Sequence, residues 1–222
     1  MPFNESRIIR PFYFLSVRLA YLLLRLLTKW QVSGKEKMPG QGPLLVVSNH
    51  LNLVDPPVIM ASLHPRRVIF MAKQELFKGP FSWIIRGVGA FSVRRNQLDR
   101  RAFRRAEEAL YAGFPVVVFP EGSRSKGSMK TGLPGAAFLA ARSGVPLLPV
   151  SIQGTERLKG KSWVLHRRHI TVTIGDPFHL PAGDGRVKGE DMESLTGFIM
   201  RRIAQLLPLS YQGIYGGDSA ED

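Results

Sequence analysis

The chain has 222 residues, enough for one domain with a substantial core, and its 44% hydrophobic and 22% charged residues argue against disorder outside the ends. It carries 31 Lys and Arg against 17 Asp and Glu, and the formal net charge of +14 indicates a polyanionic partner, either nucleic acid or an anionic lipid surface. The absence of cysteine excludes disulfides, cysteine metal sites and a thiol nucleophile.

Residues 1–30 are predicted to form an amphipathic helical segment that associates with a membrane. Arg18 and Arg25 interrupt the apolar run, so no clean stretch approaches the roughly 20 residues that span a bilayer. At about 100° per residue the basic side chains fall within one stripe, which Phe14 and Tyr21 share. That stripe consists of Arg7, Arg10, Arg18, Arg25 and Lys29. The pattern suits a helix lying in the interface, and the alternative is a helix packed on the domain itself.

Residues 31–210 are predicted to form one α/β domain, a mostly parallel central sheet flanked by helices, because short apolar runs alternate with helical stretches. Strands are expected at 42–48, 67–72, 90–93, 115–119 and 145–152, with an edge strand at 170–174 where Thr alternates with apolar residues. Helices are expected at 56–63, 80–86, 98–112, 135–143 (with Gly144 as C-cap) and 191–207. Residues 211–222 read as a disordered, Gly- and Asp-rich tail.

The first candidate for chemistry is the run Asn49-His50-Leu51-Asn52-Leu53-Val54-Asp55. His50 follows a buried strand, in a loop position where α/β folds place functional groups. Pro56 suits the first helical position, so Asp55 is predicted to be a helix N-cap. The loop can fold back so that the carboxylate reaches the imidazole, fixes its tautomer and stabilises the imidazolium. The alternative is an ordinary loop histidine beside a helix cap.

Two later turns offer donors to a phosphate. In Phe119-Pro120-Glu121-Gly122-Ser123-Arg124-Ser125, Gly122 is predicted to allow close approach of the backbone to a ligand. Ser123 and Arg124 present donors there, and Lys130 follows nearby. The run 87–95 ends a strand and delivers two arginines, Arg94 and Arg95. The alternative for both turns is solvated surface charge, and the proline-bracketed strand at 145–150 reads as core.

These four segments resemble the glycerolipid acyltransferase family, of which lysophosphatidate acyltransferases are the best-known members. The family pattern is N-H-x4-D, a G-x-F-x-V-x-R-like block, F-P-E-G-[ST]-R-S and V-P-[VIL]-x-P-V, and the four occur here in that order. The run 70–77 also resembles the stretch that the family carries between its first two motifs. The likeness covers roughly residues 32–154.

The resemblance implies a role for each matching residue. His50 would be the general base and Asp55 its orienting partner. Arg95 would reach the acceptor phosphate, while Arg94 stands where a variable or acidic residue is expected, so which arginine of the pair faces the site stays open. The predicted substrate-binding set is Lys73, Arg94, Arg95, Glu121, Gly122, Ser123, Arg124 and Lys130.

The predicted function is transfer of a fatty acyl group from acyl-CoA or acyl carrier protein to the hydroxyl of 1-acylglycerol-3-phosphate, giving phosphatidic acid. Another lysophospholipid, an amino-acid lipid or a glycolipid is the alternative acceptor. Direct transfer is favoured because the chain has neither cysteine nor a G-x-S-x-G elbow.

No cofactor and no metal are expected, and the run His166-Arg167-Arg168-His169 reads as basic surface. A nucleic-acid partner is disfavoured because no nucleic-acid module signature occurs. The expected location is the cytoplasmic face of the inner (plasma) membrane, on an anionic lipid surface.

Overall fold

The computed structural model describes residues 9–80, 82–94, 99–160, 162–181 and 189–217. The strands are β1 (Lys29–Ser33), β2 (Leu44–Ser48), β3 (Ile69–Lys73), β4 (Phe91–Val93), β5 (Pro115–Val118), β6 (Leu147–Gln153) and β7 (His169–Ile174). The α-helices are α1 (Ile9–Leu27), α2 (Asp55–Ser62), α3 (Ser82–Gly87), α4 (Arg100–Tyr111), α5 (Gly135–Ser143), α6 (Gly189–Ala204) and α7 (Leu209–Gln212). The 3₁₀ helices are η1 (Lys35–Lys37), η2 (Gln74–Phe77), η3 (Thr155–Arg157), η4 (Ser162–His166) and η5 (Gly213–Tyr215).

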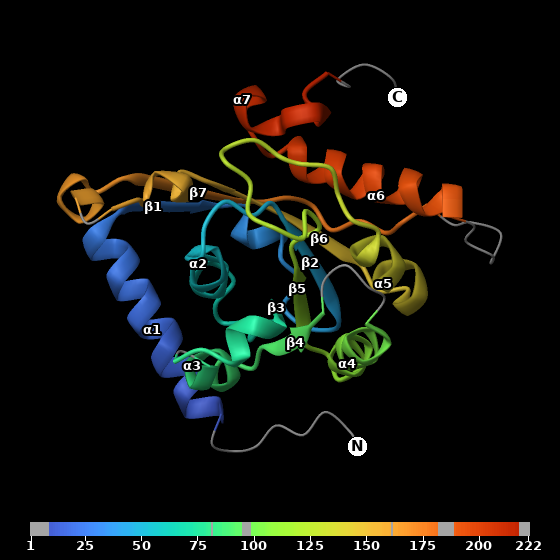
Figure 1. The fold of residues 1–222 in the computed structure, drawn as a ribbon, viewed down its shortest axis with the longest axis horizontal. Coiled ribbons are helices and arrows are strands. Elements are labelled where there is room, and N and C mark those ends of the chain that lie inside the picture. Colours follow the sequence, from blue (N-terminus) through green and yellow to red (C-terminus); the bar gives the residue numbers. More distant parts are fainter. Residues whose placement is uncertain (1–8, 81, 95–98, 161, 182–188, 218–222) are drawn as a thin grey trace.

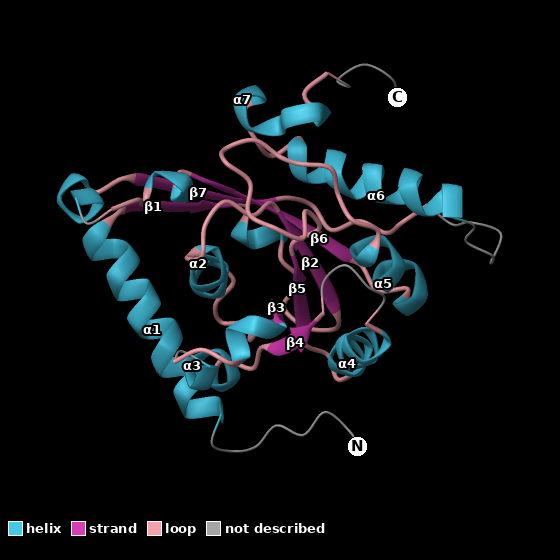
Figure 2. Ribbon diagram, in the orientation of Figure 1, coloured by secondary structure: helices cyan, strands magenta, loops and turns pink. Residues whose placement is uncertain are grey.

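A seven-stranded sheet in the order β1-β7-β6-β2-β5-β3-β4 runs through the molecule. Its described neighbours pair in parallel, except for β6 and β7, which are antiparallel. Helices α1, α2 and α3 lie on one face of the sheet, and α4, α5 and α6 lie on the other (Figures 1 and 2). The prediction of a mostly parallel sheet flanked by helices is therefore confirmed.

The central strand β2 shows how the two apolar layers form. Every residue of β2 is buried, and successive side chains point to opposite faces of the sheet. Leu44 and Val46 join the core under α1 and α2, whereas Leu45 and Val47 join the core under α4, α5 and α6. A strand covered on both faces reads as a continuous apolar run, which is why the sequence predicted it.

The edge of the sheet differs from the prediction. β7 lies between β1 and β6, so the expectation of an edge strand at 170–174 is wrong. Ile170 and Val172 are buried while the threonines between them are half-buried, so the alternation marks the two faces of the sheet and carries no information about its edge. The edge strand on this side of the sheet is β1, which the sequence did not predict. It crosses the domain boundary expected at residue 30, and its exposed polar residues alternate with the half-buried Trp30 and Val32.

Helix α1 packs on the domain and also presents an apolar surface. Its Tyr13 and Val17 are buried against the α2 side of the core, and Tyr13 Oη accepts a hydrogen bond from Val68 N at 3.0 Å. The opposite side of the helix exposes leucines by 53–66%, namely Leu15, Leu19, Leu22 and Leu26. Arg18 and Arg25 are exposed, and Arg7 lies outside the described residues. Among the described helices, none has the length and apolarity needed to cross a bilayer.

The predicted disordered tail begins with ordered residues. Residues 211–217 are described and continue from α7 into η5, while 218–222 lie outside the described residues. Met129 N donates to the carbonyl of Tyr211 at 2.8 Å, and Gly132 N donates to Tyr215 Oη at 3.2 Å. These bonds tie the segment to the loop after β5, a partner that composition alone does not reveal.

Candidate active site

The predicted site residues gather at one edge of the sheet. The carboxyl ends of parallel strands share an edge, and open α/β folds bind their ligands there. His50 follows β2, the run 121–124 follows β5, Lys73 ends β3 and Arg94 follows β4. Because these strands are neighbours in the order β2-β5-β3-β4, their loops meet along one rim of the molecule.

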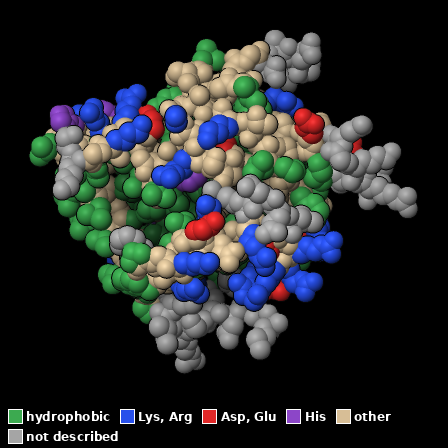
Figure 3. Space-filling model, viewed as in Figure 1, with side chains coloured by type: hydrophobic (Ala, Val, Ile, Leu, Met, Phe, Trp, Pro, Cys, Tyr) green, Lys and Arg blue, Asp and Glu red, His purple; other side chains and the backbone are tan. Residues whose placement is uncertain are grey.

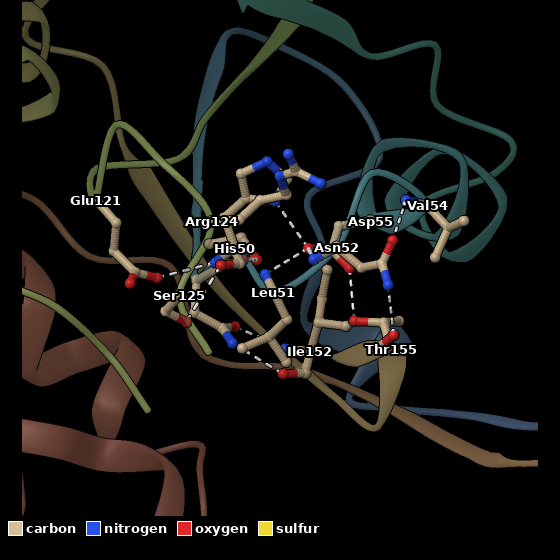
Figure 4. A network of polar contacts seen from close by, with 12 residues as sticks. His50, Leu51, Asn52, Val54, Asp55, Glu121, Arg124, Ser125, Ile152 and Thr155 are labelled. Atoms are coloured by element: carbon tan, nitrogen blue, oxygen red, sulfur yellow. Dashed lines mark hydrogen bonds and ion pairs between the residues drawn. The ribbon is translucent and has the colours of Figure 1, made fainter. Parts of the chain in front are cut away.

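His50 and Asp55 form a buried pair. The imidazole Nδ1 lies 2.8 Å from Asp55 Oδ2, and the side chains of His50 and Asp55 are 9% and 0% exposed (Figure 4). The loop from β2 to α2 therefore folds back as the spacing predicted. An ionised carboxylate at Nδ1 keeps the proton on that nitrogen, which leaves Nε2 as the acceptor. Among the described residues, nothing hydrogen-bonds to Nε2.

Asp55 is the hub of the loop. Its Oδ2 also accepts hydrogen bonds from the backbone N–H groups of Leu51 at 2.6 Å and Asn52 at 2.7 Å. Its Oδ1 accepts one from Thr155 Oγ1 at 2.7 Å. Four donors thus satisfy a fully buried carboxylate, which would otherwise be costly to bury. The prediction of Asp55 as N-cap is wrong: it is the first residue of α2, and its carboxylate binds the preceding loop in place of its own helix.

The backbone and ring of His50 are held from the β5 side. His50 N donates to Glu121 Oε1 at 2.9 Å, and its carbonyl accepts from Ser125 N at 2.7 Å. The imidazole stacks on the ring of Phe119, with centroids 4.2 Å apart and planes inclined by 21°. These contacts fix the direction in which Nε2 points, and they link the two motifs into one unit.

Glu121 is buried, and its carboxylate binds protein backbone. While Oε1 accepts from His50 N, Oε2 accepts from Lys130 N at 2.9 Å. Burial raises the pKa of Glu121, and the two backbone N–H groups oppose that shift. These contacts make Glu121 a clamp that holds two loops together, and its place in the acceptor site stays a prediction.

The turn after Glu121 depends on glycine. Gly122 has a φ of +64°, and a Cβ at this position would lie 2.4 Å from Leu133 Cδ1. This close approach is to a side chain of the protein, and the predicted approach of the Gly122 backbone to a ligand stays a prediction. Ser123 and Arg124 are exposed beyond the turn. Lys130 Nζ donates to Ser123 Oγ at 3.2 Å and to the carbonyl of Arg124 at 2.6 Å, so the lysine braces this loop.

The remaining predicted residues lie farther along the rim. Lys73 Nζ lies 3.3 Å from Glu75 Oε1, and its side chain is 44% exposed. Arg94 is exposed, and its backbone N–H donates to Asp99 Oδ2 at 2.9 Å. Arg95 lies outside the described residues. None of the described contacts joins Lys73 or Arg94 to the network around His50.

Three residues of the network were not singled out from the sequence. The amide of Asn49 pairs with β6, donating to the carbonyl of Ile152 and accepting from its N–H, both at 2.8 Å. Asn52 Nδ2 donates to the carbonyl of Thr155 at 2.8 Å, and Thr155 holds Asp55. The two asparagines flank His50 in the predicted motif. Nothing in the sequence places Thr155 beside them, because that contact depends on β6 being the neighbour of β2.

The arrangement suits proton transfer at Nε2. A neutral imidazole with an accessible acceptor nitrogen can take a proton from a hydroxyl group, while the carboxylate at Nδ1 stabilises the resulting cation. Within the described ranges, no group of three or more His, Asp or Glu side chains could hold a metal ion. The exposed Arg124 and Lys130 supply positive charge on the neighbouring loop.

Comparison with known proteins gives a family match that spans the segment from His50 to Ile152. A family model described as Acyltransferase matches residues 29–153. The chain is 28% identical over 201 residues to the 1-acyl-sn-glycerol-3-phosphate acyltransferase of Streptococcus pneumoniae, covering 85% of this chain and 74% of that one. It is 26% identical to the enzyme of the same name from Bacillus subtilis, covering 79% and 87%. The crystal structure of the 1-acyl-sn-glycerophosphate (LPA) acyltransferase PlsC from Thermotoga maritima has a TM-score of 0.64 and 27% identity, covering 92% of this chain and 84% of that one.

Proposed function

This chain belongs to the acyltransferase family, and from that premise we propose that it moves a fatty acyl group from an acyl thioester to the hydroxyl of 1-acylglycerol-3-phosphate. The product is phosphatidic acid. The similarity to enzymes named for that acceptor, from Streptococcus pneumoniae and Bacillus subtilis, supports this choice over other lysolipids. The donor is acyl-CoA or acyl carrier protein.

The observation that carries the proposal is the His50–Asp55 pair with Nε2 free to accept a proton. His50 Nε2 removes the proton from the acceptor hydroxyl as its oxygen attacks the thioester carbonyl. The tetrahedral intermediate then expels the thiolate, which takes the proton back from the imidazolium. Asp55 stays ionised and supports the cation between the two steps. One ester bond forms, one thioester bond breaks, and His50 returns to its neutral state.

Positioning of the acceptor falls to the loop after β5. This loop follows β5, the strand next to β2, and its Arg124 and Ser123 are exposed. A bidentate guanidinium contact to the acceptor phosphate would hold the neighbouring hydroxyl near Nε2. The brace from Lys130 Nζ to the Arg124 carbonyl keeps that loop in place. Gly122, Lys73 and Arg94 are assigned supporting roles in the same site.

Acyl transfer by purified variants tests the proposal. His50→Ala should lower kcat by about 10²–10⁴-fold with lysophosphatidate and an acyl-CoA, because it removes the general base. The matched control is His179→Ala, which removes an exposed histidine that lies outside the network. Circular dichroism of both variants checks the fold. Near-normal turnover by a folded His50→Ala protein would end this mechanism.

Membrane association is proposed to occur through α1. Hydrophobic side chains dominate the part of the surface formed by α1 in Figure 3. The exposed leucines of α1 include Leu15, Leu19, Leu22 and Leu26. Arg18 and Arg25 lie beside this leucine stripe and would meet anionic headgroups at the cytoplasmic face of the inner membrane. A helix that buries one stripe in the domain and offers the opposite one to lipid needs no segment that spans the bilayer.

Sedimentation with anionic vesicles tests this surface. Replacing Leu19 and Leu22 with Gln should weaken binding about a hundredfold, at roughly 1.5 kcal/mol per leucine. The control is Leu209→Gln on α7, a leucine that is 70% exposed and lies away from α1. Equal retention of the two variants on vesicles would assign the contact to another surface.

A further inference from the structure

The C-terminal segment, residues 209–215, lies against the loop after β5, residues 119–133. Figure 1 shows this loop, in yellow-green, passing beneath α7. Met129 N donates to the carbonyl of Tyr211 at 2.8 Å. A Cβ at Gly213 would lie 2.2 Å from the carbonyl oxygen of Met129, so only a glycine allows the two backbones to approach so closely there. The segment therefore supports the loop directly, backbone against backbone.

The side chain of Tyr211 reaches the turn after β6. Its Oη donates to Glu156 Oε1 at 2.8 Å, and the Glu156 side chain is 13% exposed. Arg157 Nε donates to the same oxygen at 3.2 Å, whereas Oε2 is buried and has no hydrogen-bond partner among the described residues. A buried carboxylate with one unsatisfied oxygen is costly, so Glu156 depends on the donors at Oε1. Burial and the neighbouring carboxylate raise the pKa of Tyr211, which keeps the donated proton on the phenol.

On the β5 side, this support leads to His50. Met129 is followed by Lys130, whose backbone N–H donates to Glu121 Oε2 at 2.9 Å. Glu121 Oε1 in turn accepts from His50 N at 2.9 Å. Between Glu121 and Lys130 the loop carries Arg124, the proposed contact to the acceptor phosphate. A shift of Met129 would therefore move the phosphate contact relative to the imidazole.

On the β6 side, the support leads to Asp55. Glu156 directly follows Thr155, whose Oγ1 donates to Asp55 Oδ1 at 2.7 Å and whose carbonyl accepts from Asn52 Nδ2 at 2.8 Å. The carbonyl of Tyr211 is bound by the β5 loop, and its hydroxyl binds the turn after β6. One residue of the C-terminal segment thus bridges the two loops that hold the base and its carboxylate.

We propose that Tyr211 is a positioning residue for acceptor binding, because it fixes the loop after β5 to the turn after β6 and so sets the distance from Arg124 to His50 Nε2. The inference rests on the proposed acyl transfer and extends it to a residue that contacts neither the base nor its carboxylate partner. A misplacement of about 1 Å can lower a rate by about a hundredfold. The loss of one supporting hydrogen bond allows a smaller shift, and we expect a loss of about tenfold.

Steady-state kinetics of Tyr211→Phe test this role. The substitution keeps the ring and the backbone bond to Met129, and it removes the bond to Glu156. We expect kcat/KM for lysophosphatidate to fall about tenfold, with little change for monoacylglycerol and an unchanged KM for acyl-CoA. A merely structural role would lower both acceptors alike. Equal losses for the two acceptors, a raised KM for acyl-CoA, or wild-type activity with lysophosphatidate would overturn the proposal.

Variants of Glu156 show whether the effect depends on this hydrogen bond. Glu156→Gln retains a side-chain oxygen that can accept from the Tyr211 hydroxyl, so kcat/KM for lysophosphatidate should stay within about twofold of wild type. Glu156→Leu removes the acceptor and should reproduce the loss seen in Tyr211→Phe. Combining Glu156→Leu with Tyr211→Phe should add no further loss. Additive losses in the double variant would show that the two residues act separately and would overturn the bridge.

Hydrogen exchange tests the bridge without requiring turnover. In Tyr211→Phe, backbone amides in residues 119–133 and 155–157 should exchange faster, because both loops lose their shared support. The matched control is Tyr111→Phe, which removes the hydroxyl of a tyrosine that is 68% exposed on α4. Exchange equal to that of the control would overturn the bridge. Faster exchange in a protein that transfers no acyl group to lysophosphatidate would keep the bridge and remove the proposed function.

Discussion

The substitution Asp55→Asn separates the charge of this side chain from its shape. In the native protein, Oδ2 accepts from three groups and Oδ1 accepts from Thr155 Oγ1. An asparagine can place its carbonyl oxygen where Oδ2 lies and its amide N–H₂ toward Thr155, whose hydroxyl also accepts hydrogen bonds. The loop and the tautomer of His50 are then retained. Only the negative charge beside the imidazolium is lost.

The expected magnitudes follow from these contacts. Four charge-assisted hydrogen bonds become neutral ones, each weaker by about 1 kcal/mol, while a buried charge is removed, so we expect a net loss of at most about 3 kcal/mol in unfolding free energy. Turnover should fall about 10²–10³-fold, because the imidazolium formed during proton transfer loses its counter-charge. Assays of kcat with saturating lysophosphatidate and acyl-CoA, paired with thermal unfolding, measure the two effects separately.

Thr155→Val provides the internal control for Asp55→Asn. Alone, it removes the contact to Oδ1 and leaves the His50 contact to Oδ2 intact, so kcat should change less than about fivefold. Combined with Asp55→Asn, it removes the oxygen that orients the amide. The loss of kcat in the double variant, expressed as free energy, should therefore exceed the sum of the losses in the two single variants. A folded Asp55→Asn protein with kcat within about fivefold of wild type would refute the role of the charge.

Three further predictions concern the β5 loop. Burial raises the pKa of Glu121 above its usual value of 4.5, so the protonated side chain stabilises the folded state below pH 4.5. This stabilisation is lost as the pH rises through the raised pKa, which gives the unfolding free energy a dependence on pH. Glu121→Gln should remove this dependence from unfolding free energies measured across that pH range. Gly122→Ala should cost about 1–2 kcal/mol for its φ of +64°, and Leu133→Ala should relieve only the added steric clash, as chemical denaturation will show. Arg124→Ala should lower kcat/KM by about 10–100-fold for lysophosphatidate and little for monoacylglycerol, whereas equal losses would withdraw the phosphate assignment.

Much of the fold was predictable because burial leaves local marks. The apolar run of β5 and the small-residue helix α5, with Gly144 at a φ of +66°, were identified from the sequence with nearly the observed bounds. β1 was missed because Lys, Gln and Ser occupy three of its five positions, and its partner β7 lies some 140 residues away in sequence. The alternation of Thr with apolar residues in β7 reflects one face of the strand that is only partly covered. It gives no information about whether another strand, here β1, pairs along the outer side of β7.

In the candidate site too, contacts between residues close in sequence were predictable, and contacts between distant residues were not. The contact between His50 and Asp55 spans five positions, and a loop of that length could be predicted to fold back. Thr155 is 100 positions from Asp55, and it reaches the carboxylate only because β6 pairs with β2. The role of Glu121 was also hidden, because the motif alone does not show that both of its oxygens bind backbone N–H groups of the protein.

The way α1 is fastened has a mechanical consequence. A single residue separates its end from β1, Tyr13 accepts a hydrogen bond from Val68, and Arg167 Nη2 donates to a carbonyl in its last turn at 2.8 Å. The helix is thus held against the rest of the domain at several points along its length, so its orientation relative to the sheet is fixed. With its leucines in lipid, as proposed above, the tilt of the sheet and the height of His50 above the bilayer would be set together. Loosening these contacts would change how far an acceptor must rise from the membrane to meet the imidazole, even where the protein still binds the membrane equally well.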